Sequence, residues 1–177
     1  MTLPTLQTAR LSLRPIVLTD LENLFLLRSD ESSSNFNDSV PDRCEEETLG
    51  HLTQTLKDVE EGKYWKWAID LDGALVGTIA LWNHDLLLDS AEFGYTLRSP
   101  YRGNGYMSES VAKICEYGHH VLGIKNLYVY TESCNERSIN LINKLDFVFQ
   151  GTFDEKGIHK AKTFHYNVYL HTQVDSK

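Results

Sequence analysis

The segment from Tyr64 to Leu97 contains three apolar stretches in close succession, and these limit the fold more than any other part of the sequence. The stretches read YWKWAIDL, ALVGTIALW and AEFGYTL. Asp72-Gly73 separates the first two, and Asp-Gly between apolar runs is a strong signal for a tight hairpin turn. The segment therefore predicts three β-strands that follow one another as a meander.

The part of the chain before this meander predicts one strand and two helices. RLSLRPI, at 10–16, alternates apolar and polar residues as a short strand does, and Pro15 ends it. Thr19 and Glu22 have the spacing of a capping box, which predicts a helix starting there. Residues 30–42 have the composition of a loop. A second helix follows, with apolar residues at helical spacing: Leu49, Leu52, Leu56 and Val59.

The part after the meander predicts two more helices and three more strands. A helix follows the glycine pair at 103 and 105, and Gly123 is placed to end it. NLYVYT is a strand, a helix carries Ile139, Ile142 and Leu145, and FVFQGTF and TFHYNVYL are final, antiparallel strands. This order predicts an α/β fold of mixed sheet and covering helices, without regular strand–helix alternation. A length of 177 residues suits a single domain, 1–177.

The composition argues against several classes of protein. A net charge of -8 disfavours nucleic acid as a partner, because phosphates favour basic surfaces. Three cysteines without a C-x-x-C pair predict no disulfide framework, no thiolate zinc site and a reducing cytoplasm. The histidines are too scattered to predict a metal site. We expect no membrane association, since the start lacks a signal-peptide core and no apolar run approaches roughly 20 residues.

The segment TLRSPYRGNGYMSE, at 96–109, joins two glycines to the predicted start of a helix. N–H groups at a helix start converge on an anion, and glycines let a phosphate approach the backbone. Two interpretations are open: a pyrophosphate cradle, or a turn whose glycines serve geometry alone. Ser108 stands where a dinucleotide-binding G-x-G-x-x-G motif has its third glycine, and the G-K-[ST] of a P-loop is absent, so both of those sites are disfavoured.

The chain resembles the GNAT superfamily of acetyl-CoA-dependent N-acetyltransferases in two motifs. EFGYTLRSPYRGNGYMSESV is similar to the first, which ends in R/Q-x-x-G-x-G/A at a helix start, and NERSINLINKLDF is similar to the second, N-x-x-[AS]-x-x-L-x-x-x-x-G-F. The opening TARLSLRPIVLTDLE resembles RimJ/RimL proteins in particular, and the likeness runs from Thr8 to Tyr169. It implies the GNAT fold, with a mostly antiparallel central sheet, a splayed strand pair and flanking helices.

Three positions depart from the family's pattern. Pro100 occupies the first R/Q position of the first motif, so contacts from that side chain are absent. Asp146 replaces the glycine of the second motif. Ile142 stands where many relatives have a tyrosine that protonates the leaving thiolate, so that acid has to come from elsewhere or be missing.

The resemblance implies that coenzyme A binds along the first motif. Its pyrophosphate would lie on the amides of the glycine turn, and its pantetheine arm between two parting strands. An amide at about Leu97 would bond the thioester carbonyl. Asn135 would bond the pantetheine arm, although asparagine is also a favoured helix N-cap. The implied cofactor-binding residues are Thr96, Leu97, Arg98, Arg102, Gly103, Asn104, Gly105, Tyr106, Met107, Ser108, Asn135 and Ser138.

Two residues are candidates for proton transfer in catalysis. Relatives often carry an acidic residue where this chain has Glu92, which would take the proton of the acceptor amine. Its alternation puts it on the face of Gly94 and Thr96, and the alternative role is a strand glutamate facing water. Ser138 would lie near the sulfur and bond the thiolate or relay a proton, with a plain first-turn position as the alternative.

The resemblance implies direct transfer of acetyl from acetyl-CoA to a primary amine. The RimJ/RimL likeness implies a protein N-terminal α-amine as acceptor, such as that of a ribosomal protein. A small-molecule amine such as a polyamine or an antibiotic is the alternative acceptor. A non-catalytic acyl-CoA-binding module and a protein-interaction domain are the alternatives from other classes. An exposed edge strand leaves both a monomer and a homodimer open.

Overall fold

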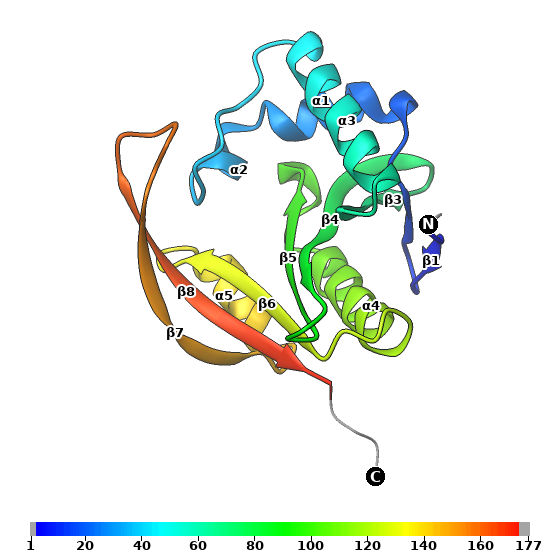
Figure 1. Cartoon of the computed structure of the whole chain (residues 1–177). Helices are drawn as coiled ribbons and strands as arrows, with labels where there is room; N and C mark the ends of the chain where they lie inside the picture. Colours follow the sequence, from blue (N-terminus) through cyan, green and yellow to red (C-terminus); the bar gives the residue numbers. More distant parts are fainter. Residues whose placement is uncertain (1–2, 174–177) are drawn as a thin grey trace.

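The computed structural model describes residues 3–173, which form an eight-stranded sheet with helices on both faces (Figure 1). The strand order is β1-β2-β3-β4-β5-β6-β8-β7. The strands are β1 (Leu6–Gln7), β2 (Ser12–Pro15), β3 (Tyr64–Leu71), β4 (Ala74–Asp85), β5 (Ser90–Leu97), β6 (Asn126–Glu132), β7 (Val148–Lys156) and β8 (Thr163–Thr172). The helices are α1 (Leu21–Arg28), α2 (Glu31–Ser34), α3 (Glu45–Glu60), α4 (Tyr106–His120) and α5 (Glu136–Asn143), with 3₁₀ turns η1 (Leu18–Asp20) and η2 (Ser99–Tyr101).

The predicted meander is confirmed as β3, β4 and β5, which pair antiparallel in sequence order. Asp72 and Gly73 form the turn between β3 and β4, and both adopt positive φ, at 54° and 87°. A two-residue turn of this kind matches the twist of the flanking strands. The local sequence thus determines the centre of the sheet.

The strands β5 and β6 run parallel and part after three residue pairs. Their register covers only Ser90↔Asn126, Ala91↔Leu127 and Glu92↔Tyr128. β6 also pairs with β8 along its whole length and β5 pairs with β4, but beyond these three pairs β5 and β6 no longer pair with each other (Figure 1). The expected splayed strand pair is therefore present, and every other neighbouring pair in the sheet is antiparallel.

Two apolar clusters hold the helices to opposite faces of the sheet. On one face α4 and α5 pack against β3–β6, and Trp67 there meets Tyr117 edge-on at 5.7 Å between ring centroids. On the other face α1 and α3 pack on Ala68 and Leu75. Side chains alternate along β5, so Phe93, Tyr95 and Leu97 face α4 and α5, whereas Glu92, Gly94 and Thr96 face the side of α1 and α3. No helix within residues 3–173 is both long and apolar enough to cross a bilayer.

Several predictions near the ends of elements were wrong. The capping box of Thr19 and Glu22 does not form, because η1 precedes α1 and the Asp20 carboxylate bonds the Val17 amide and the Arg14 guanidinium. The predicted loop at 30–42 contains α2, and β1 is an additional strand. Leu145 lies beyond the end of α5.

A pair of histidines joins the end of α4 to β8. His119 Nδ1 lies 2.6 Å from the carbonyl oxygen of Ile124, and its Nε2 lies 2.8 Å from His171 Nδ1. The first contact requires a proton on His119 Nδ1, so Nε2 accepts from His171. Burial and the neighbouring His119 lower the pKa of His171 below its ordinary value. A further proton on this pair would leave two N–H donors facing each other, at His119 Nε2 and His171 Nδ1. It would also add a positive charge to a half-buried site.

This arrangement predicts a loss of stability in acid. As pH falls through about 6.5, the unfolded chain takes up the proton at His171 before the folded chain does. The contribution of His171 to the free energy of unfolding is therefore constant above that pH and drops below it. We expect His171→Asn, whose amide can still donate to His119, to lose less stability between pH 7 and 5 than the wild type. Urea unfolding across that range measures this, with His120→Asn at the exposed neighbour as control. Parallel curves for wild type and His171→Asn would contradict the prediction.

Candidate functional site

The turn between β5 and α4 has a backbone that only glycine adopts without strain. After η2, Gly103 has φ 82° and Gly105 has φ 80°, and Gly105 immediately precedes the first residue of α4. A left-handed backbone costs a residue with a side chain roughly 1–2 kcal/mol. Both glycines are therefore required by the geometry of the turn, whatever it binds.

The start of α4 presents a row of backbone amide groups with no protein partner. Glu109 is the first residue in this region whose N–H is bonded, to the carbonyl oxygen of Gly105 at 3.1 Å. Within residues 3–173, no acceptor bonds the amides from 103 to 108. These donors converge at the positive end of a 15-residue helix, which is a favourable place for an anion such as a phosphate. The cradle is thus formed by the backbone.

The side chain of Arg102 is turned away from this row of amides. Its Nε donates to the carbonyl oxygen of Leu97 at 2.9 Å, and its remaining donors reach Ser32 and Ser33 at 2.8 Å and Asp30 at 3.3 Å. The guanidinium therefore ties the end of β5 to α2. Because its donors are used in these bonds, the Arg102 guanidinium is not available to bind a phosphate at the glycine turn.

The Leu97 backbone is oriented toward the parting of β5 and β6. The Arg98 amide donates to the carbonyl oxygen of Val76 at 2.9 Å. Donors alternate along an antiparallel strand, so the amides of Leu97 and Tyr95 point away from β4. The Arg98 guanidinium is bonded to Asn23 at 2.9 Å on the side of α1.

The start of α5 lies across the parting from β5. Asn135 caps the helix, accepting the Ser138 amide at 3.2 Å, so its side-chain oxygen has the structural role that asparagine commonly takes there. Ser138 Oγ lies 2.9 Å from the hydroxyl of Tyr95. Burial raises the pKa of Tyr95 to about 12, despite its bond to Ser138, so the phenol is protonated at neutral pH.

Tyr95 is not among the site residues predicted from the sequence. Alternation along AEFGYTL places it on the face of α5, and that signal was available. Ile142, at the position of the family's tyrosine, is fully buried in the core. A phenol therefore does reach this part of the site, from β5 and not from α5.

Glu92 lies on the opposite face of β5, as predicted, and both of its oxygens are bonded. Trp82 Nε1 donates to one and Asn83 Nδ2 to the other, each at 3.0 Å. The Trp82 ring covers Gly94, where an added Cβ would lie 2.7 Å from the ring. The carboxylate is thus held in a fixed place beside the strand.

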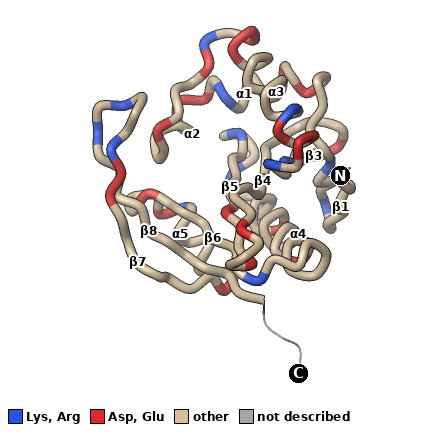
Figure 2. The backbone as a smooth tube through the Cα atoms, viewed as in Figure 1, with Lys and Arg blue, Asp and Glu red and all other residues tan. Residues whose placement is uncertain are grey.

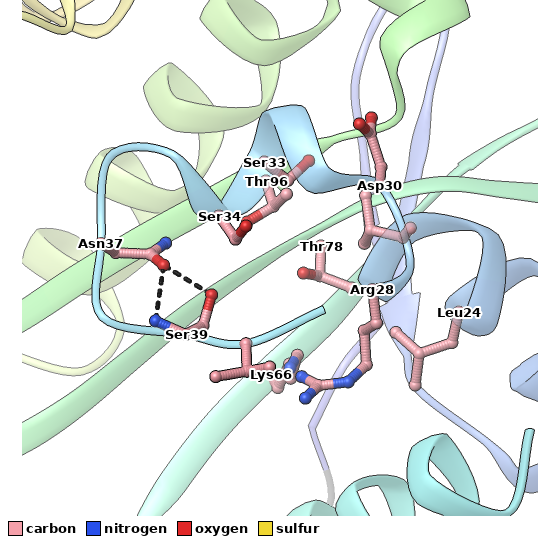
Figure 3. A pocket seen from close by; sticks show the side chains of 12 residues that line it. Leu24, Arg28, Asp30, Ser33, Ser34, Asn37, Ser39, Lys66, Thr78 and Thr96 are labelled. Carbon is pink, nitrogen blue, oxygen red and sulfur yellow. Dashed lines mark hydrogen bonds between the residues drawn. The ribbon is translucent and has the colours of Figure 1, made fainter. Parts of the chain in front are cut away.

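A pocket of about 100 Å³ lies on this same face (Figure 3). Thr96 of β5 and Thr78 of β4 form part of its wall together with Lys66 of β3. The other lining residues come from α1, the turn between α1 and α2, α2 and the segment after α2, namely Leu24, Leu27, Arg28, Asp30, Ser33, Ser34, Asn37, Ser39 and Val40. Thr96 is the only one from β5, so the pocket adjoins the strand whose amides face the parting.

The loop between β7 and β8 is fastened to the rim of this pocket. Asp38 accepts the backbone amides of Ile158 at 2.5 Å and of His159 and Lys160 at 2.9 Å. Lys160 Nζ also bonds the carbonyl oxygens of Ser34 and Asn37. The tip of the β7–β8 hairpin, at the edge of the sheet, therefore lies beside α2 (Figure 1).

The four bonds of the Arg102 guanidinium predict a specific loss of stability. Lysine cannot span from Leu97 to α2 with a planar fork, so Arg102→Lys should lower the free energy of unfolding by about 1–3 kcal/mol. Urea unfolding measures this, and Arg137→Lys on the exposed face of α5 should change it by less than about 0.5 kcal/mol. Equal effects of the two substitutions would show that the guanidinium does not fasten α2 to β5.

Known proteins share both the sequence pattern and this geometry. The sequence profile described as "Acetyltransferase (GNAT) domain" matches residues 10–148. The chain is 26% identical over 168 residues to the uncharacterized N-acetyltransferase YoaA of Bacillus subtilis, covering 94% of this chain and 95% of that one. It is 24% identical over 139 residues to the spermidine N(1)-acetyltransferase of Escherichia coli, covering 78% and 73%.

A solved structure gives the same fold. RimL, a ribosomal L7/L12 alpha-N-protein acetyltransferase solved in complex with coenzyme A, superposes with a TM-score of 0.86 at 17% identity, covering 96% of this chain and 98% of that one. The unpaired amides of the glycine turn fit a pyrophosphate. The chain therefore belongs to the GNAT acetyltransferase family and is an N-acetyltransferase with acetyl-CoA as its cosubstrate.

Proposed function

We propose that this enzyme transfers acetyl from acetyl-CoA directly to the α-amine of a protein N-terminus, without a covalent enzyme intermediate. The observation that carries the proposal is the row of unpaired amides from 103 to 108, next to the parting of β5 and β6. The name of RimL supports a protein N-terminus as the acceptor. The name of the E. coli spermidine acetyltransferase supports the alternative, a small amine.

The cradle and the parting define how the cosubstrate would be held. The amides of the glycine turn, including those of Met107 and Ser108 in α4, would bind the pyrophosphate. The pantetheine arm would lie along β5, with Asn135 and Ser138 of α5 on its other side. The Leu97 amide, which points into the parting, would bond the thioester carbonyl and stabilise the oxyanion as it forms.

Residues on the two faces of β5 would manage the protons. The acceptor amine has to lose a proton to attack, and Glu92 would take it, directly or through a water molecule. The leaving sulfur gains a proton or a hydrogen bond as the bond to carbon breaks, and Ser138 would supply it. Tyr95 would donate to Ser138 Oγ and so leave the serine proton free for the sulfur. Holding amine and thioester together would supply much of the rate.

Two measurements test the proposed activity. Titration calorimetry should show saturable binding of acetyl-CoA, with NAD and ATP as controls that do not compete. A thiol-release assay with peptide N-termini and spermidine then separates enzyme from binding module. Binding without thiol release for any amine would favour a non-catalytic acyl-CoA module. Absence of binding in a folded sample would return the turn to a purely structural role.

The contact between Tyr95 and Ser138 predicts which substitutions slow the reaction. Ser138→Ala should lower kcat about 10- to 100-fold, and Tyr95→Phe should lower it by a smaller factor, because the phenol acts through the serine. KM for acetyl-CoA should change little in either. The double variant should be no slower than Ser138→Ala alone.

The control is Tyr117→Phe, which removes a phenol from α4 where it packs on Trp67. It should keep the wild-type kcat. If Ser138→Ala and Tyr95→Phe both keep the wild-type kcat, neither residue takes part in proton transfer.

A further inference from the structure

The pocket beside Thr96 has three charged side chains in its lining: Arg28, Asp30 and Lys66. Figure 3 shows Arg28 and Lys66 together at one end of it, with Asp30 apart from them. The balance of these charges decides which kind of acceptor the pocket favours.

Two of the three charges are compensated by the protein itself. Arg28 makes a forked pair with Asp42, at 2.5 and 3.0 Å. Burial alone would raise the pKa of Asp42, but the bonds from Arg28 and Thr48 lower it, so the carboxylate stays ionised. Asp30 is bonded to Ser32 and Ser99 and pairs with Arg102. Neither charge is left over for a ligand.

Lys66 is the charge that remains. Its ammonium lies 5.8 Å from the centre of the Tyr64 ring, and within residues 3–173 no carboxylate pairs with it. Burial and the nearby Arg28 lower the pKa of Lys66 to about 8, so the side chain is still mostly protonated at pH 7. A partly buried ammonium without a counter-ion is costly, and an anion in the pocket would offset that cost.

A second cation stands at the rim of the pocket. The Lys160 ammonium is bonded to the carbonyl oxygens of Ser34 and Asn37, and no carboxylate of residues 3–173 forms an ion pair with it, so its charge is hydrogen-bonded but not neutralised. Lys156 ends β7 and Lys162 lies on the β7–β8 loop, where Figure 2 shows positive residues at the tip of the hairpin, and Lys162 lies 3.9 Å from Glu132. Lys160 therefore adds a positive charge beside Asp38 at the rim of the pocket, although the chain as a whole carries a charge of -8.

We propose that this pocket binds a carboxylate of the acceptor through Lys66, so that the enzyme prefers an N-terminal amine followed by an acidic residue over a neutral peptide or a polyamine. This inference rests on the proposed acetyl transfer to an N-terminus. Thr78 and Thr96 carry hydroxyls that can donate to the same carboxylate. Thr96 lies on one face of β5, and Tyr95, which contacts Ser138, lies on the other face. The pocket therefore adjoins the strand along which the thioester would lie, and the acceptor amine would meet the thioester there.

The test compares peptides that differ in one charge. The probes are Ser-Glu-Ala-Ala-amide and Ser-Gln-Ala-Ala-amide, with free serine as a source of an α-carboxylate and spermidine as a polycation. Thiol release from acetyl-CoA gives kcat/KM for each. We expect the glutamate peptide to exceed the glutamine peptide by about 10-fold or more, as a charge-assisted bond allows. A higher kcat/KM for free serine than for the glutamate peptide would show that the pocket binds the α-carboxylate of an amino acid. It would overturn the preference for a peptide with an acidic second residue.

The substitution Lys66→Met should reduce the ratio of the two peptides to near one. Lys63→Met is the matched control, since Lys63 is exposed on the same hairpin and paired with Glu61, and its ratio should stay at the wild-type value. Thermal melting checks that each variant is folded. Equal rates with both peptides in the wild type, or a ratio unchanged by Lys66→Met, would overturn the proposal. Absence of thiol release with every amine would instead contradict the proposed transferase activity.

Discussion

The early separation of β5 from β6 is the constraint on which the functional site depends. Three residue pairs join these strands, and beyond them β6 keeps only β8 as its neighbour. The amides on the free side of β5, including those of Tyr95 and Leu97, are left without a strand to bond, as are the amides at the start of α4. A sheet seldom leaves such donors unused, because unpaired backbone groups are costly when buried. A ligand that accepts hydrogen bonds from these amides relieves that cost.

The same strand separates two chemical environments. One face of β5 carries Tyr95, which meets Ser138 of α5, and the other carries Thr96, which lines the pocket near Lys66. Arg102 connects them, because it holds the end of β5 and the α2 segment that forms the pocket wall. Asp38 adds the β7–β8 loop to that wall. The glycine turn and the free side of β5 thus present backbone groups, whereas the pocket on the other face is assembled from side chains of distant segments.

That difference explains how much the sequence could predict. The meander, the Asp72-Gly73 turn and the helix after Gly105 follow from local periodicity and turn chemistry, so they were predicted correctly. Asp146, which stands at the glycine position of the second motif, adopts a positive φ of 59°, a conformation that favours glycine. The bond from Tyr95 to Ser138 joins residues 43 positions apart, and those from Asp38 to the loop span 120 to 122. Such contacts depend on tertiary packing, which local patterns do not encode.

The central claim, that the backbone of the glycine turn and the free side of β5 hold acetyl-CoA, is tested most directly by amide NMR. A ¹⁵N-labelled sample titrated with acetyl-CoA should show the largest shifts at the amides from 103 to 108, with further shifts at Tyr95 and Leu97. Saturable binding that leaves these amides unmoved while others shift would contradict the account. It would place the cosubstrate elsewhere and make the glycine turn a structural feature alone.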